Sequence, residues 1–115
     1  MNRLPLIMLI ALLLLTACSK QTYGIEIKEA NVTQINQALN LKDSTDTLRL
    51  EGKIGAVCPT GCWFYLEDNS GEIYVDLAPS GIAIPQSTGK KAVVEGSYIK
   101  VKENSVFVAK GVEIK

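Results

Sequence analysis

Residues 47–78 decide the fold, and they read TLRLEGKIGAVCPTGCWFYLEDNSGEIYVDLA. Apolar and polar side chains alternate at 47–57 and 72–78, and the run between them, 62–68, carries bulky side chains on both faces. A repeat of two residues is typical of β-strands that bury one face. The sequence Asn-Ser-Gly at 69–71 has the composition of a tight turn between the second and third runs. This stretch therefore predicts three antiparallel strands, with a bulge or sharp bend at Gly52 in the first.

Two further strands are predicted towards the C-terminus, at 91–102 and 105–114, with Gly96 interrupting the first of them. The connector 79–90 holds two prolines and two glycines, which leaves room for at most one helical turn. Five strands in this order match the oligonucleotide/oligosaccharide-binding (OB) barrel, in which a long, curved first strand serves both halves. We therefore expect an all-β fold, a small five-stranded OB-like barrel. A small β-sandwich is the alternative that the same strand count permits.

Upstream of the strands the apolar spacing changes to three and four residues. Val32, Ile35, Ala38 and Leu39 then share one face of a helix, and Asn31 is placed to cap its N-terminus. The sequence thus predicts a short amphipathic helix within 28–41, ahead of the barrel.

The N-terminus has the pattern of an export signal. Arg3 precedes an apolar run from Leu4 to Leu15, and Leu15-Thr16-Ala17-Cys18 resembles the lipobox of bacterial lipoproteins. The run is shorter than the roughly 20 apolar residues that a membrane-spanning helix needs. An ordinary secretory signal with an incidental cysteine is the alternative. The expected organisation is a cleaved lipoprotein signal peptide at 1–17, a lipidated tether at 18–27 starting with acylated (palmitate-bearing) Cys18, and the barrel with its leading helix at 28–115.

Such a chain would be anchored in the cell envelope and face the periplasm. Ser19, directly after the acylated cysteine, favours the outer membrane over the inner one. The chain carries 12 basic and 12 acidic residues, which is not the basic surplus of a nucleic-acid-binding domain. The expected partners are the membrane, through the lipid, and an unidentified envelope protein or small ligand, whereas nucleic acid is disfavoured.

Cys58 and Cys62 flank three residues at the turn of the first predicted hairpin. Residues that face each other across such a turn can meet the Cα separation of a disulfide, about 4.4–6.8 Å. Because an exported domain meets an oxidising compartment, a structural disulfide is the main expectation. A reduced pair that binds copper as Cu(I), or that exchanges thiols, is the alternative. A closed zinc site is not expected, because the chain has no histidine and Cys18 is taken up by the lipid.

Large aromatic residues gather on the second and third predicted strands. Trp63, Tyr65 and Tyr74 are candidates for an exposed ligand-binding face, since OB barrels bind single strands or glycans on this face. The alternative is that they fill the interior. Asp68 and Asp76 place negative charge on the same strands and are expected to lie on a solvated sheet face. The chain lacks histidine, a glycine-rich phosphate loop and a recognisable nucleophile motif, so we expect a non-catalytic protein without a cofactor.

Four short motifs carry a family resemblance: Gly52-Lys53-Ile54, Val57-Cys58, Gly61-Cys62-Trp63-Phe64 and Val94-Glu95-Gly96. Together they resemble domain of unknown function 4920, a family of small exported bacterial OB-fold proteins. The resemblance spans about Leu48 to Ile114. It implies a barrel and export, and it adds no activity.

Overall fold

The computed structural model describes residues 20–28, 31–41, 47–101 and 104–115. The predicted signal peptide and Cys18 lie outside the described residues. The elements, in chain order, are β1 (Gln21–Gly24), α2 (Ile35–Leu39), β2 (Leu48–Val57), β3 (Trp63–Asp68), β4 (Gly71–Asp76), a 3₁₀ turn η1 (Ala78–Ser80), β5 (Lys91–Val101) and β6 (Asn104–Ile114).

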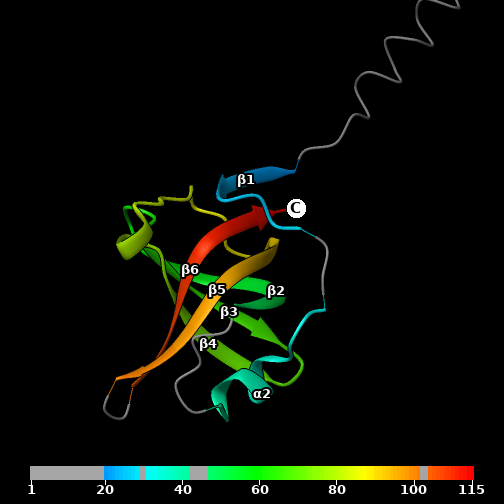
Figure 1. Cartoon of the computed structure of the whole chain (residues 1–115). Coiled ribbons are helices and arrows are strands. Elements are labelled where there is room, and N and C mark those ends of the chain that lie inside the picture. The colour runs from blue at the N-terminus through cyan, green and yellow to red at the C-terminus, as the bar shows by residue number, and fades with distance from the viewer. Residues whose placement is uncertain (1–19, 29–30, 42–46, 102–103) are drawn as a thin grey trace, which may run out of the picture.

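Five of the strands close into a barrel (Figure 1). β2, β3 and β4 form an antiparallel meander, β4 then pairs in parallel with β6, and β5 pairs with both β6 and β2. Because this ring of pairings leaves one continuous sheet, the OB-like barrel is confirmed and the β-sandwich is wrong. The predicted single helical turn after the third barrel strand is the short η1.

β2 is the strand that serves both halves of the barrel. It pairs with β5 from Leu48 to Lys53 and with β3 from Lys53 onward. The bend depends on Gly52, where a Cβ would lie only 2.3 Å from the carbonyl oxygen of Glu67. The irregular register predicted at Gly52 lies instead between Ile54 and Val57. Gly52 therefore allows the close approach of β3, and the bulge follows it.

The barrel interior holds the inward-facing side chain of every second strand residue. Tyr98, Phe64 and Phe107 are the largest fully buried side chains, and Leu50, Ile54, Leu66, Ile73, Val75, Val94 and Val112 pack around them. The register of β5 against β6 shifts between Glu95 and Gly96, which confirms the interruption predicted at Gly96.

The leading helix is shorter than predicted and starts later. α2 begins at Ile35, with Gln34 at the N-cap, so the prediction of Asn31 as the cap was wrong. Val32 is 49% exposed and does not belong to the buried face, whereas Ile35 and Ala38 are fully buried. The helix covers one end of the barrel, beside the turn between β3 and β4 (Figure 1).

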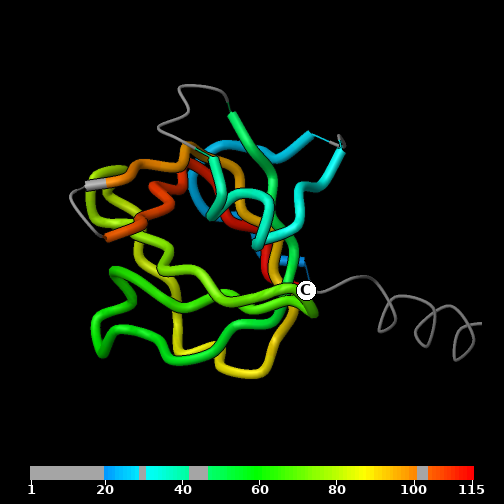
Figure 2. Tube along the Cα trace, turned by 90° about the horizontal axis from the view of Figure 1, so that it is seen from below, coloured from blue at the N-terminus to red at the C-terminus, as the bar shows by residue number. Residues whose placement is uncertain are grey.

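The segment predicted as a tether contains a strand. β1 pairs antiparallel with the end of β6, in a register that places Gln21 opposite Ile114. Figures 1 and 2, related by a 90° turn, both show the C-terminus beside the start of the described chain. The polar composition of this strand hid it, because a strand at the edge of a sheet needs no apolar face. Among the described residues, no helix has the length and apolar character to cross a bilayer.

Candidate functional site: an aromatic surface beside a thiol pair

Trp63, Tyr65 and Tyr74 come together on the outside of the barrel. They alternate with the buried Phe64, Leu66, Ile73 and Val75, so the strand period places them outward. The register sets Tyr65 directly opposite Tyr74. The three ring centroids are 5.6–5.8 Å apart, with Trp63 and Tyr74 tilted by 33° and the other two pairs edge to face. We call these three half-buried rings the aromatic surface.

A hollow of about 360 Å³ adjoins the aromatic surface. It is lined by Tyr65, Tyr74, Asn104, Ser105 and Val106. The parallel pairing of β4 with β6 brings Val106 opposite Tyr74, far along the chain. Asn104, Ser105 and Val106 could not be predicted as site residues, because no local pattern reveals which strand closes a barrel.

The electrostatic surroundings of the aromatic surface are acidic. Burial raises the pKa of Tyr74, and the negative charge of Asp76 raises it further. Asp76 lies opposite Trp63, while Glu67 and Glu72 face each other farther along the same strand pair. A phosphate group bound here would therefore meet like charge.

Asp68 and Asp76, expected on a solvated sheet face, do not lie opposite each other. The β3–β4 register places Asp68 opposite Gly71 and Asp76 opposite Trp63, at opposite ends of the ladder. Asp68 instead accepts hydrogen bonds from the backbone N–H of Ile35, at 3.0 Å, and from the N–H and hydroxyl of Ser70. Burial alone would raise the pKa of Asp68, but these hydrogen bonds outweigh it and hold the pKa below its usual value. Asp68 thus accepts the first backbone N–H of α2 from outside the helix, because Gln34 at the N-cap position makes no side-chain hydrogen bond there.

Cys58 and Cys62 are both free thiols in the structure. The disulfide between them therefore stays a prediction. Cys58 is 7% exposed, and Cys62 is half-buried. A hydrogen bond with the Cys62 thiol, followed by one with the Thr60 hydroxyl at 3.3 Å, lowers the pKa of Cys58 from 9.0 to about 6.

The loop between the two cysteines is held by backbone hydrogen bonds. Cys58 donates its N–H to the Trp63 carbonyl at 2.9 Å, and Gly61 donates to the Cys58 carbonyl at 2.8 Å. The connector after η1 adds a second clamp, because Ile84 donates to the Gly61 carbonyl at 3.1 Å. Gly61 has φ +77°, the left-handed conformation that is common at the end of a three-residue hairpin loop.

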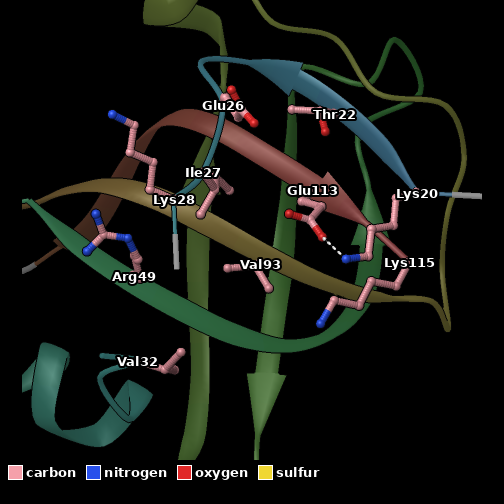
Figure 3. Close-up of a pocket in the computed structure, with 10 residues that line it drawn as sticks. All are labelled: Lys20, Thr22, Glu26, Ile27, Lys28, Val32, Arg49, Val93, Glu113 and Lys115. Carbon is pink, nitrogen blue, oxygen red and sulfur yellow. Dashed lines mark ion pairs between the residues drawn. The ribbon is translucent and has the colours of Figure 1, made fainter. Parts of the chain in front are cut away.

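A larger groove of about 610 Å³ lies on a different part of the barrel (Figure 3). The segment at 20–28 forms one wall, and the rest comes from side chains of β2, β5 and β6 together with Val32 and Lys115. Figure 3 shows the lysines and glutamates around its rim. Lys20 pairs with Glu113 at 3.6 Å, and Arg49 pairs with the buried Glu95 at 2.8 Å. Because Lys20, Glu113 and Arg49 are already held in ion pairs, and because the aromatic rings lie elsewhere, we place the candidate ligand site on the aromatic surface.

No protein-family model and no curated protein matches the chain. Among solved structures, the fold of the chain is similar to that of the hypothetical protein YgiW from E. coli, with a TM-score of 0.61 and 19% sequence identity. The alignment covers 75% of this chain and 91% of that one. At this identity the likeness shows the fold alone: the chain has an OB-like barrel like that of YgiW.

Proposed function

We propose that this protein is a non-catalytic binding module, anchored by lipid on Cys18 to the outer membrane and facing the periplasm. Its OB-like barrel is a fold that commonly carries ligand sites on one sheet face. No bound group is needed for the barrel to close, since its interior is filled by side chains. The sequence has no histidine and no recognisable nucleophile motif, and this supports a role in binding.

The aromatic surface is the ligand site, and its geometry is the observation that carries the proposal. Three rings meet outside a core that is already filled by Phe64 and Phe107, so they are not needed to complete it. Half-buried rings present a rigid, flat surface at little entropic cost. Asn104 and Ser105 supply hydrogen-bonding groups at the edge of the adjoining hollow.

The ligand class that fits this surface best is a neutral glycan. Sugar rings stack on aromatic side chains and offer hydroxyl and amide groups to polar neighbours. A single-stranded nucleic acid would also stack, but its affinity depends on cationic groups that contact the phosphates. These strands instead carry the acidic residues Asp76, Glu67 and Glu72, which would repel the phosphates.

The anchor would hold the barrel close to the bilayer. Gln21, the first residue of β1, comes three positions after Cys18, and this stretch of chain spans at most about 11 Å when fully extended. Stable anchoring follows from more than one buried acyl chain, at about 0.8 kcal/mol per methylene. The barrel would therefore lie within a short distance of the lipid headgroups.

The binding test uses the fluorescence of Trp63, the one tryptophan of the chain. A tetramer of β-1,4-linked N-acetylglucosamine is titrated into the full chain in detergent, and a ten-residue oligothymidine is titrated in parallel at two salt concentrations. We expect saturable quenching by the sugar, lost in Tyr74→Ala and retained in the control Tyr23→Ala, whose ring lies on β1. Salt-dependent binding of the oligonucleotide with no response to the sugar would refute the glycan proposal.

The anchor has its own test, mass spectrometry of the mature protein purified from membranes. We expect an N-terminus at Cys18 with its acyl groups. A chain that retains Met1, or that begins elsewhere without lipid, would refute the anchoring and leave the binding test unaffected.

A further inference from the structure

We propose that Cys58 and Cys62 form a binding site for one Cu(I) ion beside the aromatic surface. The site is separate from the glycan site, and its test depends neither on the glycan nor on the lipid anchor. It concerns the reduced state of the same thiol pair for which the sequence predicts a disulfide.

Cys58 and Cys62 lie at the two ends of a closed loop, without a bond between them. Cys58 donates its N–H to the Trp63 carbonyl at 2.9 Å, and the Thr60 hydroxyl lies 3.3 Å from the sulfur of Cys58. The backbone around them is fixed from both sides of the hairpin. Leu77 donates its N–H to the Cys62 carbonyl at 3.0 Å, and the Gln86 side chain donates to the Cys58 carbonyl at 2.8 Å.

Such a pair is preorganised, because closing it on a ligand requires little ordering of the chain. One member is also accessible, since Cys62 is half-buried while Cys58 is nearly covered. An ion can therefore reach the sulfur of Cys62 from solvent and complete its coordination at Cys58.

The two sulfur donors select the metal. Within the ranges that the structure describes, no third cysteine, histidine or carboxylate forms a group with the two thiols. Structural zinc requires four ligands, and calcium or magnesium requires several oxygens, so two sulfurs alone satisfy none of them. Cu(I) is a soft ion that thiolates select. Binding forms two S–Cu bonds and releases the two thiol protons to solvent, and no electron is transferred.

The thiol pair also lies beside Trp63 in the sequence. Cys62 directly precedes Trp63, whose ring is 5.6 Å from that of Tyr74. Burial is the main cause of the raised pKa of Tyr74, and negative charge on Cys62 and Cys58 contributes to it, so the thiols lie near the aromatic surface. An ion bound here would lie next to the tryptophan, which makes its fluorescence a direct report on occupancy.

The experiment measures Cu(I) affinity by competition with bathocuproine disulfonate. It uses the full chain carrying Cys18→Ser, so that the pair supplies the only thiols, reduced with a phosphine and kept free of oxygen. We expect one Cu(I) per chain and quenching of Trp63 at the same stoichiometry. Cys58→Ser and Cys62→Ser should each weaken binding by about 100-fold or more, because even the loss of a second-sphere group commonly costs 10–100-fold.

The control is the same chain after mild oxidation has joined the two cysteines. It keeps every side chain around the site and should bind no Cu(I), whether or not the serine variants fold. Failure of the reduced chain to retain Cu(I) against the competitor would overturn the proposal. Equal retention by the oxidised chain, or equally tight binding of Zn(II), would overturn it as well.

Discussion

Replacement of Gly61 by alanine tests whether the hairpin loop is locked in place by the connector after η1. Gly61 has φ +77°, and a Cβ there would lie 2.0 Å from the carbonyl oxygen of Ile84. A residue other than glycine in this conformation costs roughly 1–2 kcal/mol, and loss of the 3.1 Å hydrogen bond from Ile84 costs about 1 kcal/mol more. We therefore expect Gly61→Ala to lower the free energy of unfolding by about 2–3 kcal/mol. Urea denaturation followed by circular dichroism measures this difference.

Two other glycines separate the backbone cost from the steric one. Gly89 has φ +91° but has nothing within 4 Å of a built Cβ, so Gly89→Ala should cost only roughly 1–2 kcal/mol. Gly55 lacks a positive φ, and its built Cβ would lie 3.6 Å from the nearest atom. Gly55→Ala should therefore be neutral or stabilising by up to about 1 kcal/mol. If Gly61→Ala cost no more than Gly89→Ala, the contact with Ile84 would not lock the loop.

Three more predictions follow from the charged and ionisable groups. Arg49→Ala removes the 2.8 Å partner of buried Glu95 and should cost about 3–5 kcal/mol in urea denaturation, whereas replacing both residues by leucine should cost far less; equal losses would contradict this. The pKa of Asp68 is lowered in the folded protein. Its contribution to folding stability is therefore complete above about pH 3.9, the ordinary pKa of an aspartate, and is lost as the pH falls through the lowered pKa. Asp68→Asn should flatten the acid limb of the curve of stability against pH, and an unchanged limb would refute the role of this carboxylate. The rate of alkylation of Cys58 by iodoacetamide, resolved by mass spectrometry, should rise around pH 6 and level off well below pH 9.0. Thr60→Val should move this midpoint upward, and a wild-type midpoint near 9.0 would contradict the hydrogen-bonded thiol pair.

The barrel strands could be predicted from local pattern because each buries one face. The pattern predicted that one face of β3 and β4 fills the core, but it left open whether Trp63 and Tyr74 lie inside or outside; the structure places both outside. The same period explains why the three rings share one face, and the binding of a ligand there stays a prediction. The structure adds the contacts between the rings and thus the case for a ligand surface.

The remaining features depend on contacts between distant segments. The start of α2 is set by Asp68, whose carboxylate accepts the N–H of Ile35, and no local rule would prefer this residue to Asn31. β1 forms only because the end of β6 presents an unpaired edge to it. The hollow beside Tyr74 likewise requires β6, since Val106 becomes its neighbour through barrel closure.

Chemical-shift mapping by NMR tests the central claim most directly. The ¹⁵N-labelled full chain in detergent micelles is titrated with the N-acetylglucosamine tetramer, and the shifted resonances are assigned to residues. We expect the indole N–H of Trp63 and the backbone amides of Tyr65, Tyr74 and Ser105 to shift together and saturate. Shifts confined to Lys28 and Arg49, in the charged groove, or no saturable shift at all, would contradict the aromatic surface as the ligand site.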